Sequence, residues 1–416
     1  MQENISVVGG GIIGLCSAYY LNKAGYNVTV IDRSEITDGC SFGNMGFISP
    51  SHFVPLASPG IIAEGLKYML RSNSPFYMKP RLNLPFLQWA YRFYKNSNET
   101  IARKNGLPLS SMLQLSRSLI NDLKSDLGET FSLEEKGCLM LCRNEHTLNH
   151  EKELAIAGGL LGLQVRMLDA KEVQALEPDV EVSVKGAALF KDDCHLNPGL
   201  LMKELKAYLI NKKVDFRLHN TVIGFEQNTD KVKAVITDKE KINCDQLVVA
   251  TGSWLPATAK LLGIKMLLQA GKGYSFTYEN VEKNIKYPAI LVDARCAVSP
   301  WQNKLRIGGT MEFSGINNRV LAKRMQGIYD SVSTFYPGLA VAPPKEKIWN
   351  GLRPVTPDGI PYLGRTKKYK NVIFAGGHAM LGLSQGTGTG KIVTEIIQGK
   401  PLSIDIGAFN PDRYYR

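Results

Sequence analysis

Residues 5–32 of the chain read ISVVGGGIIGLCSAYYLNKAGYNVTVID, and they carry the clearest structural pattern in the sequence. An apolar strand leads directly into three consecutive glycines, and a helical pattern follows. Gly9 permits a tight turn after the strand, Gly11 lets the backbone approach a phosphate, and Gly14 allows the helix to pack closely on the strand. The helix N-terminus adds N–H groups and a positive dipole end, so this pattern predicts a phosphate site.

A carboxylate ends the second strand of this segment. The apolar run 27–31 stops at Asp32, eighteen residues past Gly14, where an acid can accept hydrogen bonds from ribose hydroxyls. Strand, glycines, helix, strand and terminal acid in this order indicate a Rossmann dinucleotide site. The pattern does not distinguish NAD from FAD, so the rest of the sequence must decide.

Two later segments predict further strands of the same parallel sheet. Residues 247–252, LVVATG, and residues 372–375, VIFA, are short apolar runs that end in small-residue turns. A glycine-rich helix follows the second run, and its positive end could face an electron-rich ring. Residues 386–391, GTGTGK, are not a P-loop, because Gln385 and Ile392 stand where a glycine and a magnesium-binding hydroxyl are required. We expect these glycines to let the helix approach a cofactor.

The composition is that of an ordinary globular protein. With 416 residues, of which 44% are hydrophobic and 21% charged, the chain is long enough for two domains. The net charge is +12, but the 50 Lys and Arg residues are spread through the sequence, so we expect no nucleic-acid partner. A signal peptide and a membrane-spanning run are not predicted, and seven scattered cysteines do not suggest disulfides. A reducing, cytoplasmic location is therefore predicted.

Several motifs resemble the FAD-dependent amine and amino-acid oxidoreductases, a family that includes D-amino acid oxidase, glycine oxidase, sarcosine oxidase and D-amino acid dehydrogenase. Residues 41–50, SFGNMGFISP, look like the flavin-contacting loop of the D-amino acid dehydrogenase branch. Residues 250–254, ATGSW, and 349–359, WNGLRPVTPDG, resemble further family segments. Residues 377–382, GHAMLG, resemble bacterial dehydrogenases that act on cis-4-hydroxy-D-proline. The resemblance covers nearly the whole chain and implies FAD, bound without a covalent link.

This resemblance implies an α/β fold with two discontinuous domains. A Rossmann-type FAD-binding domain is expected at residues 1–65, 195–265 and 350–416. Residues 66–194 and 266–349 are expected to form an α+β substrate-binding domain on a mostly antiparallel sheet.

The family pattern also assigns individual residues. Arg353 matches the arginine that holds the substrate carboxylate, a role that suits a planar guanidinium, although a structural ion pair is the alternative. Tyr274 could add a hydroxyl to the same carboxylate or pack in its strand. His52 and His378 flank flavin-contacting segments and could bond the ring or the substrate, or serve only the structure. The residues expected to contact FAD are Gly9, Gly11, Ile12, Ile13, Gly14, Asp32, Arg33, Ser41, Asn44, Met45, Gly46, Ile48, Val222, Thr251, Gly252, Trp254, Gly377, His378, Leu381, Gly382, Leu383 and Ser384.

The implied reaction is oxidation of a small D-amino or D-imino acid, of the D-proline, cis-4-hydroxy-D-proline or D-alanine type. A hydride passes from Cα to the flavin and leaves an imine, while the protein supplies orientation and a dry pocket. The alternatives are a glycine- or sarcosine-type oxidase that uses O2 and a flavin-binding protein without amine chemistry. A quinone or other respiratory-chain acceptor is expected, and peripheral attachment to the inner face of the cell membrane stays open.

No metal site is predicted. Cys138 and Cys142 would share one face of a strand and suit a core. His146 and His150 have helical ligand spacing but lack the glutamate of a metalloprotease motif.

Residues 55–96 have helical stretches interrupted by prolines. Their aromatic residues are too closely spaced to share one helical face. Such a segment could cover the active site or touch a membrane, but a helix pair buried against the sheet is the preferred interpretation.

Overall fold

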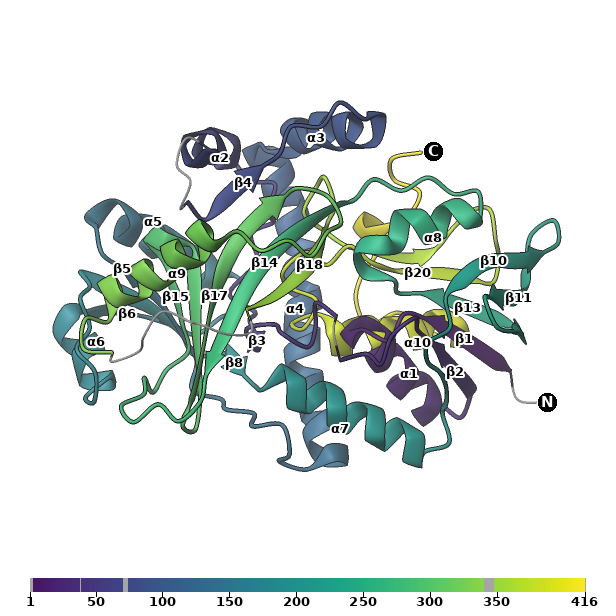
Figure 1. Ribbon diagram of the computed structural model, residues 1–416, viewed down its shortest axis with the longest axis horizontal. Coiled ribbons are helices and arrows are strands. Elements are labelled where there is room, and N and C mark those ends of the chain that lie inside the picture. The colour runs from purple at the N-terminus through teal and green to yellow at the C-terminus, as the bar shows by residue number, and fades with distance from the viewer. Residues whose placement is uncertain (1–2, 38, 70–73, 340–347, 416) are drawn as a thin grey trace.

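The computed structural model describes residues 3–37, 39–69, 74–339 and 348–415, and it contains two main sheets that lie side by side (Figure 1). The strands of the first sheet are β1 (Asn4–Val8), β2 (Asn27–Ile31), β9 (Asp215–Arg217), β13 (Gln246–Val249), β19 (Tyr362–Arg365) and β20 (Val372–Gly376). They follow the order β19-β20-β13-β1-β2-β9, and only β19 runs antiparallel to its neighbour. The predicted Rossmann sheet is thereby confirmed.

Four helices pack in the core beside this sheet: α1 (Ile12–Lys23), α4 (Glu99–Leu127), α7 (Pro198–Asn211) and α10 (Gly386–Gln398). Glycines of α10 allow the closest contacts. A Cβ on Gly390 would lie 2.4 Å from the Cys16 carbonyl oxygen of α1, and one on Gly388 would lie 2.9 Å from Met112 Sδ of α4. Glycine at these two positions is therefore required by the neighbouring helices, and the approach of α10 to a cofactor stays a prediction.

A second, larger sheet has the strand order β18-β14-β17-β16-β15-β5-β7-β6, with β4 beside β17. Most of its pairs are antiparallel, as predicted, and the exceptions are β15 with β5 and β17 with β4. The strands are β4 (Phe76–Met78), β5 (Cys138–Cys142), β6 (Val165–Asp169), β7 (Gly186–Phe190), β14 (Gln269–Tyr278), β15 (Ala289–Leu291), β16 (Cys296–Trp301), β17 (Lys304–Phe313) and β18 (Trp349–Val355).

The predicted domain boundary at residue 350 falls inside β18. This strand pairs with β14 from Trp349 to Val355, so it belongs to the larger sheet. Conversely, α4 comes from the segment 66–194 but buries Leu109, Leu113 and Leu123 in the core beside the Rossmann sheet. The rest of the predicted division stays a prediction.

The remaining elements surround these two sheets. Short strands β3 (Phe47–Ile48) and β8 (Cys194–His195) pair with each other, and a three-stranded sheet flanks the Rossmann sheet. The latter comprises β10 (Val222–Gln227), β11 (Val232–Thr237) and β12 (Lys241–Asn243). The other helices are α2 (Ile61–Met69), α3 (Leu84–Asn96), α5 (Glu145–Leu160), α6 (Ala170–Leu176), α8 (Leu255–Leu261), α9 (Ala322–Phe335) and the 3-10 turns Gly252–Trp254, Val292–Ala294 and Gly407–Phe409.

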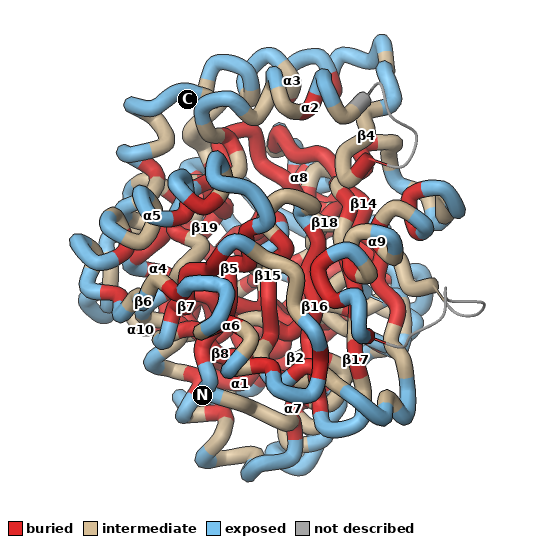
Figure 2. The backbone as a smooth tube through the Cα atoms, turned by 90° about the vertical axis from the view of Figure 1, so that its left-hand side faces the viewer, coloured by how far each residue is buried: buried red, intermediate tan, exposed pale blue. Residues whose placement is uncertain are grey.

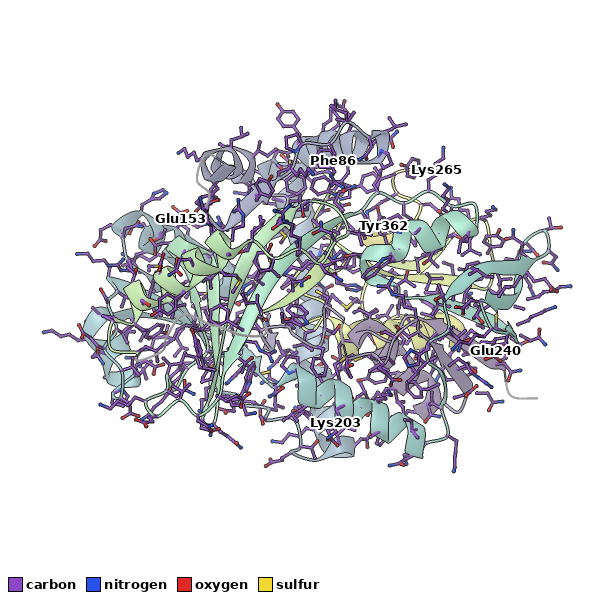
Figure 3. All side chains as sticks on the ribbon, in the orientation of Figure 1. Phe86, Glu153, Lys203, Glu240, Lys265 and Tyr362 are labelled. Carbon is purple, nitrogen blue, oxygen red and sulfur yellow. The ribbon has the colours of Figure 1, made fainter. Side chains whose placement is uncertain are left out.

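Helices α2 and α3 form an outer layer at one edge of the molecule, where Figure 2 shows α3 largely exposed. Phe86 lies where α3 meets the body of the molecule (Figure 3), and it is buried. Trp89 is also buried, and its indole nitrogen donates a hydrogen bond to the Val355 carbonyl at 2.9 Å. Residues 70–73 of the segment 55–96 lie outside the described residues, and the preferred interpretation of this segment fits one face of α3 but not its exposed face. Within the described ranges, no helix is long and apolar enough to cross a membrane.

Candidate active site

The turn between β1 and α1 leaves space for a ligand at one of its glycines. Gly9 has a φ of +106°, and a Cβ there would lie 2.4 Å from the Ala250 carbonyl oxygen. A Cβ on Gly14 would lie 1.8 Å from the Gly9 carbonyl oxygen. By contrast, a Cβ on Gly11 would come within 4 Å of one described group, Ser41 Oγ at 3.5 Å. The backbone at Gly11 is therefore open to a phosphate at the start of α1.

Asp32 lies at the end of β2 and holds this turn. One carboxylate oxygen accepts from the Gly10 N–H at 2.7 Å, and the other accepts from the N–H and hydroxyl of Ser34 at 2.9 and 3.0 Å. Each oxygen can accept two hydrogen bonds, so the first retains room for a ribose hydroxyl. The Asn220 N–H donates to the Asp32 carbonyl at 2.9 Å, and this bond brings Val222 to the same edge of the sheet.

The ends of β2 and β13 carry three more of the predicted cofactor residues. The Arg33 guanidinium lies 3.8 Å from the centroid of a Trp254 ring, so these two side chains stack. Thr251 Oγ1 is buried without a hydrogen-bond partner among the described residues. Because buried hydroxyls are almost always bonded, this atom indicates a missing polar ligand. The residues at this edge fit a bound dinucleotide.

The loop 41–48 is fastened to the larger sheet through its backbone carbonyls. Side chains of β14, β16 and β17 donate the hydrogen bonds, and β3 closes the loop against β8. The three bonds run from Ser275 Oγ to the Gly43 oxygen at 3.0 Å, from Ser299 Oγ to the Met45 oxygen at 2.6 Å and from Arg306 Nη1 to the Asn44 oxygen at 2.6 Å. The loop with the predicted flavin-contacting residues is therefore held to the larger sheet, and the Ile12 N–H of α1 also donates to Ser41 Oγ at 3.0 Å. These predicted residues are Ser41, Asn44, Met45, Gly46 and Ile48.

The C-terminal cofactor segment, residues 377–384, reaches the same loop. Ser384 Oγ donates to the Phe47 carbonyl at 2.8 Å and accepts from the Ser49 N–H at 3.1 Å. His378 is buried, and its Nε2 lies 3.1 Å from Thr389 Oγ1. Burial lowers the pKa of His378 to about 3, so its imidazole is neutral at neutral pH. The segment continues through Leu381, Gly382 and the buried Leu383.

Arg353 lies on β18, and its position depends on a glycine in the neighbouring strand. A Cβ on Gly273 of β14 would lie 2.2 Å from Arg353 Nη2, so only glycine leaves room for the guanidinium there. Arg353 Nη1 donates to the Thr310 carbonyl at 2.5 Å. No acidic side chain in the described part of the chain forms an ion pair with Arg353. Burial lowers the pKa of Arg353, yet a guanidinium stays charged, so it is a cation ready for an anionic ligand.

Thr310 presents its carbonyl to Arg353 from an unusual backbone conformation. Its φ is +69°, which is a strained value for a β-branched residue. The pairing of β14 with β17 shifts register between Lys272 and Tyr274, so Thr310 lies in a bulge opposite Gly273. Bulges redirect side chains and carbonyls beside active sites, and this one holds the arginine.

Tyr274 lies on the opposite face of β14 from the Arg353 guanidinium. Side chains alternate along a strand, so Gly273 faces Arg353 while Tyr274 points into the core behind the sheet. The Tyr274 hydroxyl donates to the carboxylate of Glu312, which also forms a buried ion pair with Lys272 at 3.1 Å. The expectation that Tyr274 adds a hydroxyl to the carboxylate anchor is not supported by this placement, whereas the packing alternative fits it.

His52 belongs to a chain of hydrogen bonds that ends in a buried acid. The Ser51 N–H and hydroxyl donate to Asp193 at 3.0 and 2.6 Å, and Ser51 Oγ lies 2.9 Å from His52 Nδ1. Burial raises the pKa of Asp193 to about 7 and lowers the pKa of His52 to about 4. When Asp193 is ionised, the Ser51 oxygen accepts from Nδ1–H, and His52 Nε2 keeps its lone pair as an acceptor.

The segment that carries His52 runs between two of the predicted site regions. Ser49 bonds to Ser384 at one end, and Leu56 packs with Val355 and Ala379 at the other. His52 therefore lies on the chain that links the flavin-contacting loop to the neighbourhood of β18.

The structure thus brings the glycine turn, the loop 41–48, the segment 377–384 and Arg353 to the junction of the two sheets. Sequence reasoning missed Asp193, Thr310 and Arg306, which hold the predicted residues in place. Asp193 follows another aspartate in an ordinary polar turn, and no local pattern distinguishes it. Cys138 and Cys142 are buried in β5, and nowhere in the described ranges do three or more metal-ligating side chains gather.

The chain matches a family model and several curated proteins over nearly its full length. The family described as DAO, FAD dependent oxidoreductase, matches residues 4–396. The D-amino acid dehydrogenase of Helicobacter pylori is 32% identical over 399 residues, which cover 96% of this chain and 95% of that protein. The D-amino acid dehydrogenase of Granulibacter bethesdensis is 29% identical over 410 residues, with 96% and 97% covered.

Two solved structures share the fold. Glycine oxidase from Geobacillus kaustophilus superposes with a TM-score of 0.79 at 19% identity, covering 100% of both chains. L-proline dehydrogenase from P. horikoshii superposes with a TM-score of 0.78 at 18% identity, covering 99% of this chain and 98% of that one. These structures agree with the α/β arrangement of two sheets described above.

Proposed function

Because the chain belongs to the DAO family of FAD-dependent oxidoreductases, we propose that it oxidises the Cα–N bond of a small D-amino or D-imino acid. FAD is its cofactor. The proposed substrates are of the D-alanine, D-proline or cis-4-hydroxy-D-proline type. Relatives named D-amino acid dehydrogenase support this substrate class.

The observation that carries the proposal is the Arg353 guanidinium. It is held by Gly273 and Thr310, and no acid in the described ranges neutralises it. A carboxylate bound by two parallel charge-assisted hydrogen bonds would complete its coordination. Amino and imino acids carry such a carboxylate on the carbon that is oxidised, so this anchor would also position Cα.

The predicted cofactor residues divide between the two ends of FAD. The turn at Gly11 would hold the diphosphate, and Asp32 would hold the ribose. The loop 41–48 and the segment 377–384 would hold the ring without a covalent bond. Bound there, FAD would supply the hydride acceptor for oxidation of the substrate Cα–N bond to an imine, which would be cyclic for a proline derivative.

The chain's own side chains supply orientation and hydrogen bonds rather than strong acids or bases. His378 is neutral and buried, so it adds no charge beside the ring. The Asp193–Ser51 pair would keep His52 Nε2 as an acceptor, which suits an N–H of the substrate amine or of the flavin. Arg353 would fix the carboxylate of a substrate whose amine enters in its neutral form, so that the nitrogen lone pair is available as the hydride leaves Cα.

An anaerobic bleaching screen tests this proposal. The yellow FAD-loaded protein is mixed with both enantiomers of alanine, proline and 4-hydroxyproline, and with glycine and sarcosine. We expect loss of flavin absorbance with D-enantiomers alone. Bleaching by glycine or sarcosine, with peroxide formed in air, would assign the chain to the oxidase alternative. Bleaching by none of these compounds would refute amine chemistry at this site.

The proposal includes a quinone or other respiratory-chain component as electron acceptor. A membrane-dissolved acceptor requires the enzyme to approach a bilayer, so we place it in the cytoplasm with peripheral attachment to the inner face of the cell membrane. Reduction of a soluble quinone analogue under nitrogen, compared with O2 consumption in air, distinguishes this acceptor from oxygen.

A further inference from the structure

Helix α3 has two apolar stripes, of which only one is buried. Its inner stripe packs Phe86, Trp89 and Phe93 toward the larger sheet. Its outer stripe follows the spacing three, four and three residues, as one face of a helix requires. These outer residues are Leu84, Leu87, Tyr91 and Tyr94, and all are exposed. A helix with an unpartnered apolar stripe of this kind indicates a binding surface.

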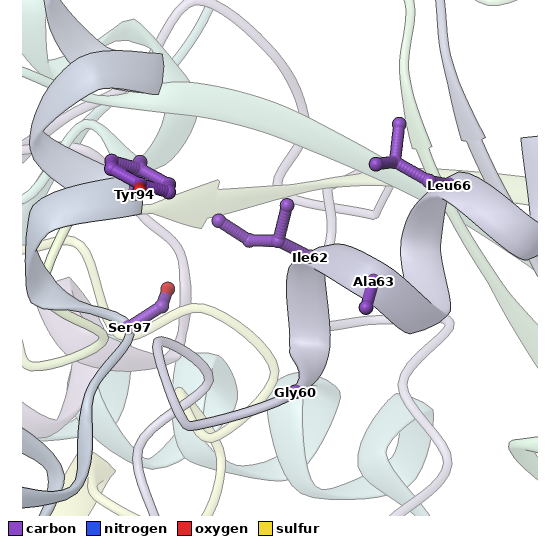
Figure 4. Close-up of a pocket in the computed structure, with 6 residues that line it drawn as sticks. All are labelled: Gly60, Ile62, Ala63, Leu66, Tyr94 and Ser97. Atoms are coloured by element: carbon purple, nitrogen blue, oxygen red, sulfur yellow. The ribbon is translucent and has the colours of Figure 1, made fainter.

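Neighbouring residues extend the outer stripe into one surface. Leu82 is 95% exposed just before α3, and Leu66 is 60% exposed on α2. A hollow of about 320 Å³ lies between the two helices, and Figure 4 shows Ile62 directed across it toward Tyr94. We call this surface the α3 patch. Its exposed apolar residues are Leu66, Leu82, Leu84, Leu87, Tyr91 and Tyr94.

The segment that carries the α3 patch is strongly basic. Residues 60–98 contain six Lys or Arg and one acid, so they contribute +5 of the chain's +12. The acid, Glu64, is engaged by Arg295 at 2.8 and 2.5 Å. In the described part of the chain, no carboxylate pairs with the basic residues Lys67, Lys79, Arg81, Arg92 and Lys95. The α3 patch thus lies in a segment whose described cations lack carboxylate partners in the protein, although Arg81 donates to the Gln269 side chain at 2.7 Å.

We infer that the α3 patch docks on the surface of a lipid bilayer that contains anionic headgroups. Leucines would enter the boundary of the acyl chains, tyrosines would lie at headgroup depth, and the cations would contact lipid phosphates. A second copy of the chain fits this surface poorly, because a two-fold contact would place +5 against +5. The inference names the surface by which the chain would reach the proposed membrane-dissolved acceptor. Only the reason for docking rests on that proposed function, since the docking surface itself is argued from the α3 patch.

Vesicle sedimentation with the FAD-loaded full chain tests the inference. Vesicles of phosphatidylcholine alone are compared with vesicles that contain phosphatidylglycerol as well. We expect binding to the anionic vesicles, weakened by added salt, and little binding to phosphatidylcholine alone. The double variant Leu84→Glu/Leu87→Glu should bind at least about tenfold more weakly. It removes two apolar side chains from the contact and adds two negative charges that the anionic headgroups repel.

A matched control separates the patch from a general charge effect. Ile156→Glu/Leu160→Glu changes the same net charge at exposed apolar residues of α5, and it should bind like the unchanged chain. Equal losses in both double variants, no binding to anionic vesicles, or a dimer that the α3 variant dissociates would each overturn the inference. The assay needs no substrate, so its failure and the failure of the bleaching screen are distinguishable.

Discussion

Arg353 connects the backbone geometry of the larger sheet to substrate binding. Its guanidinium is set by the absence of a side chain at Gly273 and by a carbonyl from the strained residue Thr310. Strain at a β-branched residue persists only where its surroundings hold it, and such sites cluster where a group must be positioned. The anchor is therefore built from two strands and a bulge rather than from one side chain.

Replacing the guanidinium should uncouple substrate binding from FAD binding. We expect Arg353→Gln to keep its flavin spectrum but to raise KM for the D-amino acid by about 100-fold or more, because loss of a charge-assisted pair costs several kcal/mol. Steady-state kinetics with a quinone analogue measure this. An unchanged KM would show that another residue holds the carboxylate.

A milder substitution tests the position of Arg353 rather than its charge. In Gly273→Ala, the new Cβ would meet Arg353 Nη2 at 2.2 Å, and the flexible end of that side chain would move. We expect an increase in KM of about tenfold with little change in the thermal unfolding midpoint. Gly159→Ala is the control, because a Cβ there meets no described atom within 4 Å. Equal kinetics in both variants would contradict the positioning role of Gly273.

The candidate site residues that could be predicted are those with local patterns. The glycine turn and Asp32 form one continuous segment whose spacing carries its geometry, whereas the loop 41–48 was indicated by its resemblance to a family segment. Thr310 could not be found in this way, since its role depends on a register shift between β14 and β17. The family pattern offered Tyr274 as a second group for the substrate carboxylate, but strand alternation directs its side chain to the face of β14 away from Arg353.

At the scale of elements, the turn between β1 and α1 uses its glycines for different purposes. A Cβ on Gly14 would collide with backbone at 1.8 Å, whereas a Cβ on Gly11 would have space in the protein alone. Gly14 thus serves the packing of α1 on β1. Gly11 serves the approach of a ligand.

This difference predicts two distinct phenotypes. Without FAD, Gly11→Val should unfold at nearly the same urea midpoint as the unchanged chain without FAD. The variant should bind FAD at least about 100-fold more weakly, because its side chain fills the phosphate position. Gly14→Ala should lower the stability of the FAD-free chain by about 2 kcal/mol or more, since helix and strand must separate. FAD titration and urea unfolding of both variants provide the measurements. A yellow Gly11→Val protein would contradict the assignment of that glycine.

Helices and strands were predictable where the apolar residues followed a single pattern, either a short apolar run or one helical face. The apolar strands around residues 5–8, 247–249 and 372–375 were expected and lie together in one parallel sheet. The segment 55–96 was harder to predict because α3 carries two apolar faces, and a single-sequence pattern cannot tell which one meets the protein. The assignment of β18 to the larger sheet also depended on long-range pairing with β14.

At the scale of the whole molecule, buried titratable groups link stability to pH in opposite directions. Burial raises the pKa values of Asp193, Glu151 and Glu177 to about 7. Above pH 7 these buried carboxylates are ionised and lower the free energy of unfolding, and this destabilisation is relieved as the pH falls. Burial lowers the pKa of His378 to about 3 and that of His52 to about 4. Their stabilising contribution is complete above about pH 6.5 and is lost as the pH falls toward these folded values.

Because the two effects overlap in one pH window, a histidine variant is needed to separate them. Between pH 6.5 and pH 5 the folded state keeps His378 neutral while the same residue in the unfolded chain binds a proton. This difference lowers the free energy of unfolding by about 2 kcal/mol, at about 1.4 kcal/mol per pH unit. We therefore expect His378→Gln to lose about 2 kcal/mol less stability than the unchanged chain between pH 7.5 and pH 5. Urea unfolding of the FAD-loaded proteins at both pH values measures this difference.

His146→Gln is the matched control, because His146 is exposed on α5 and should leave the acid-induced loss unchanged. Glutamine at position 378 can still bond to Thr389, so a smaller loss would come from removing the titratable ring rather than from an empty space. If both variants lost as much stability in acid as the unchanged chain, His378 would not be the neutral group that its burial requires. The uncharged environment proposed beside the flavin would then be incorrect as well.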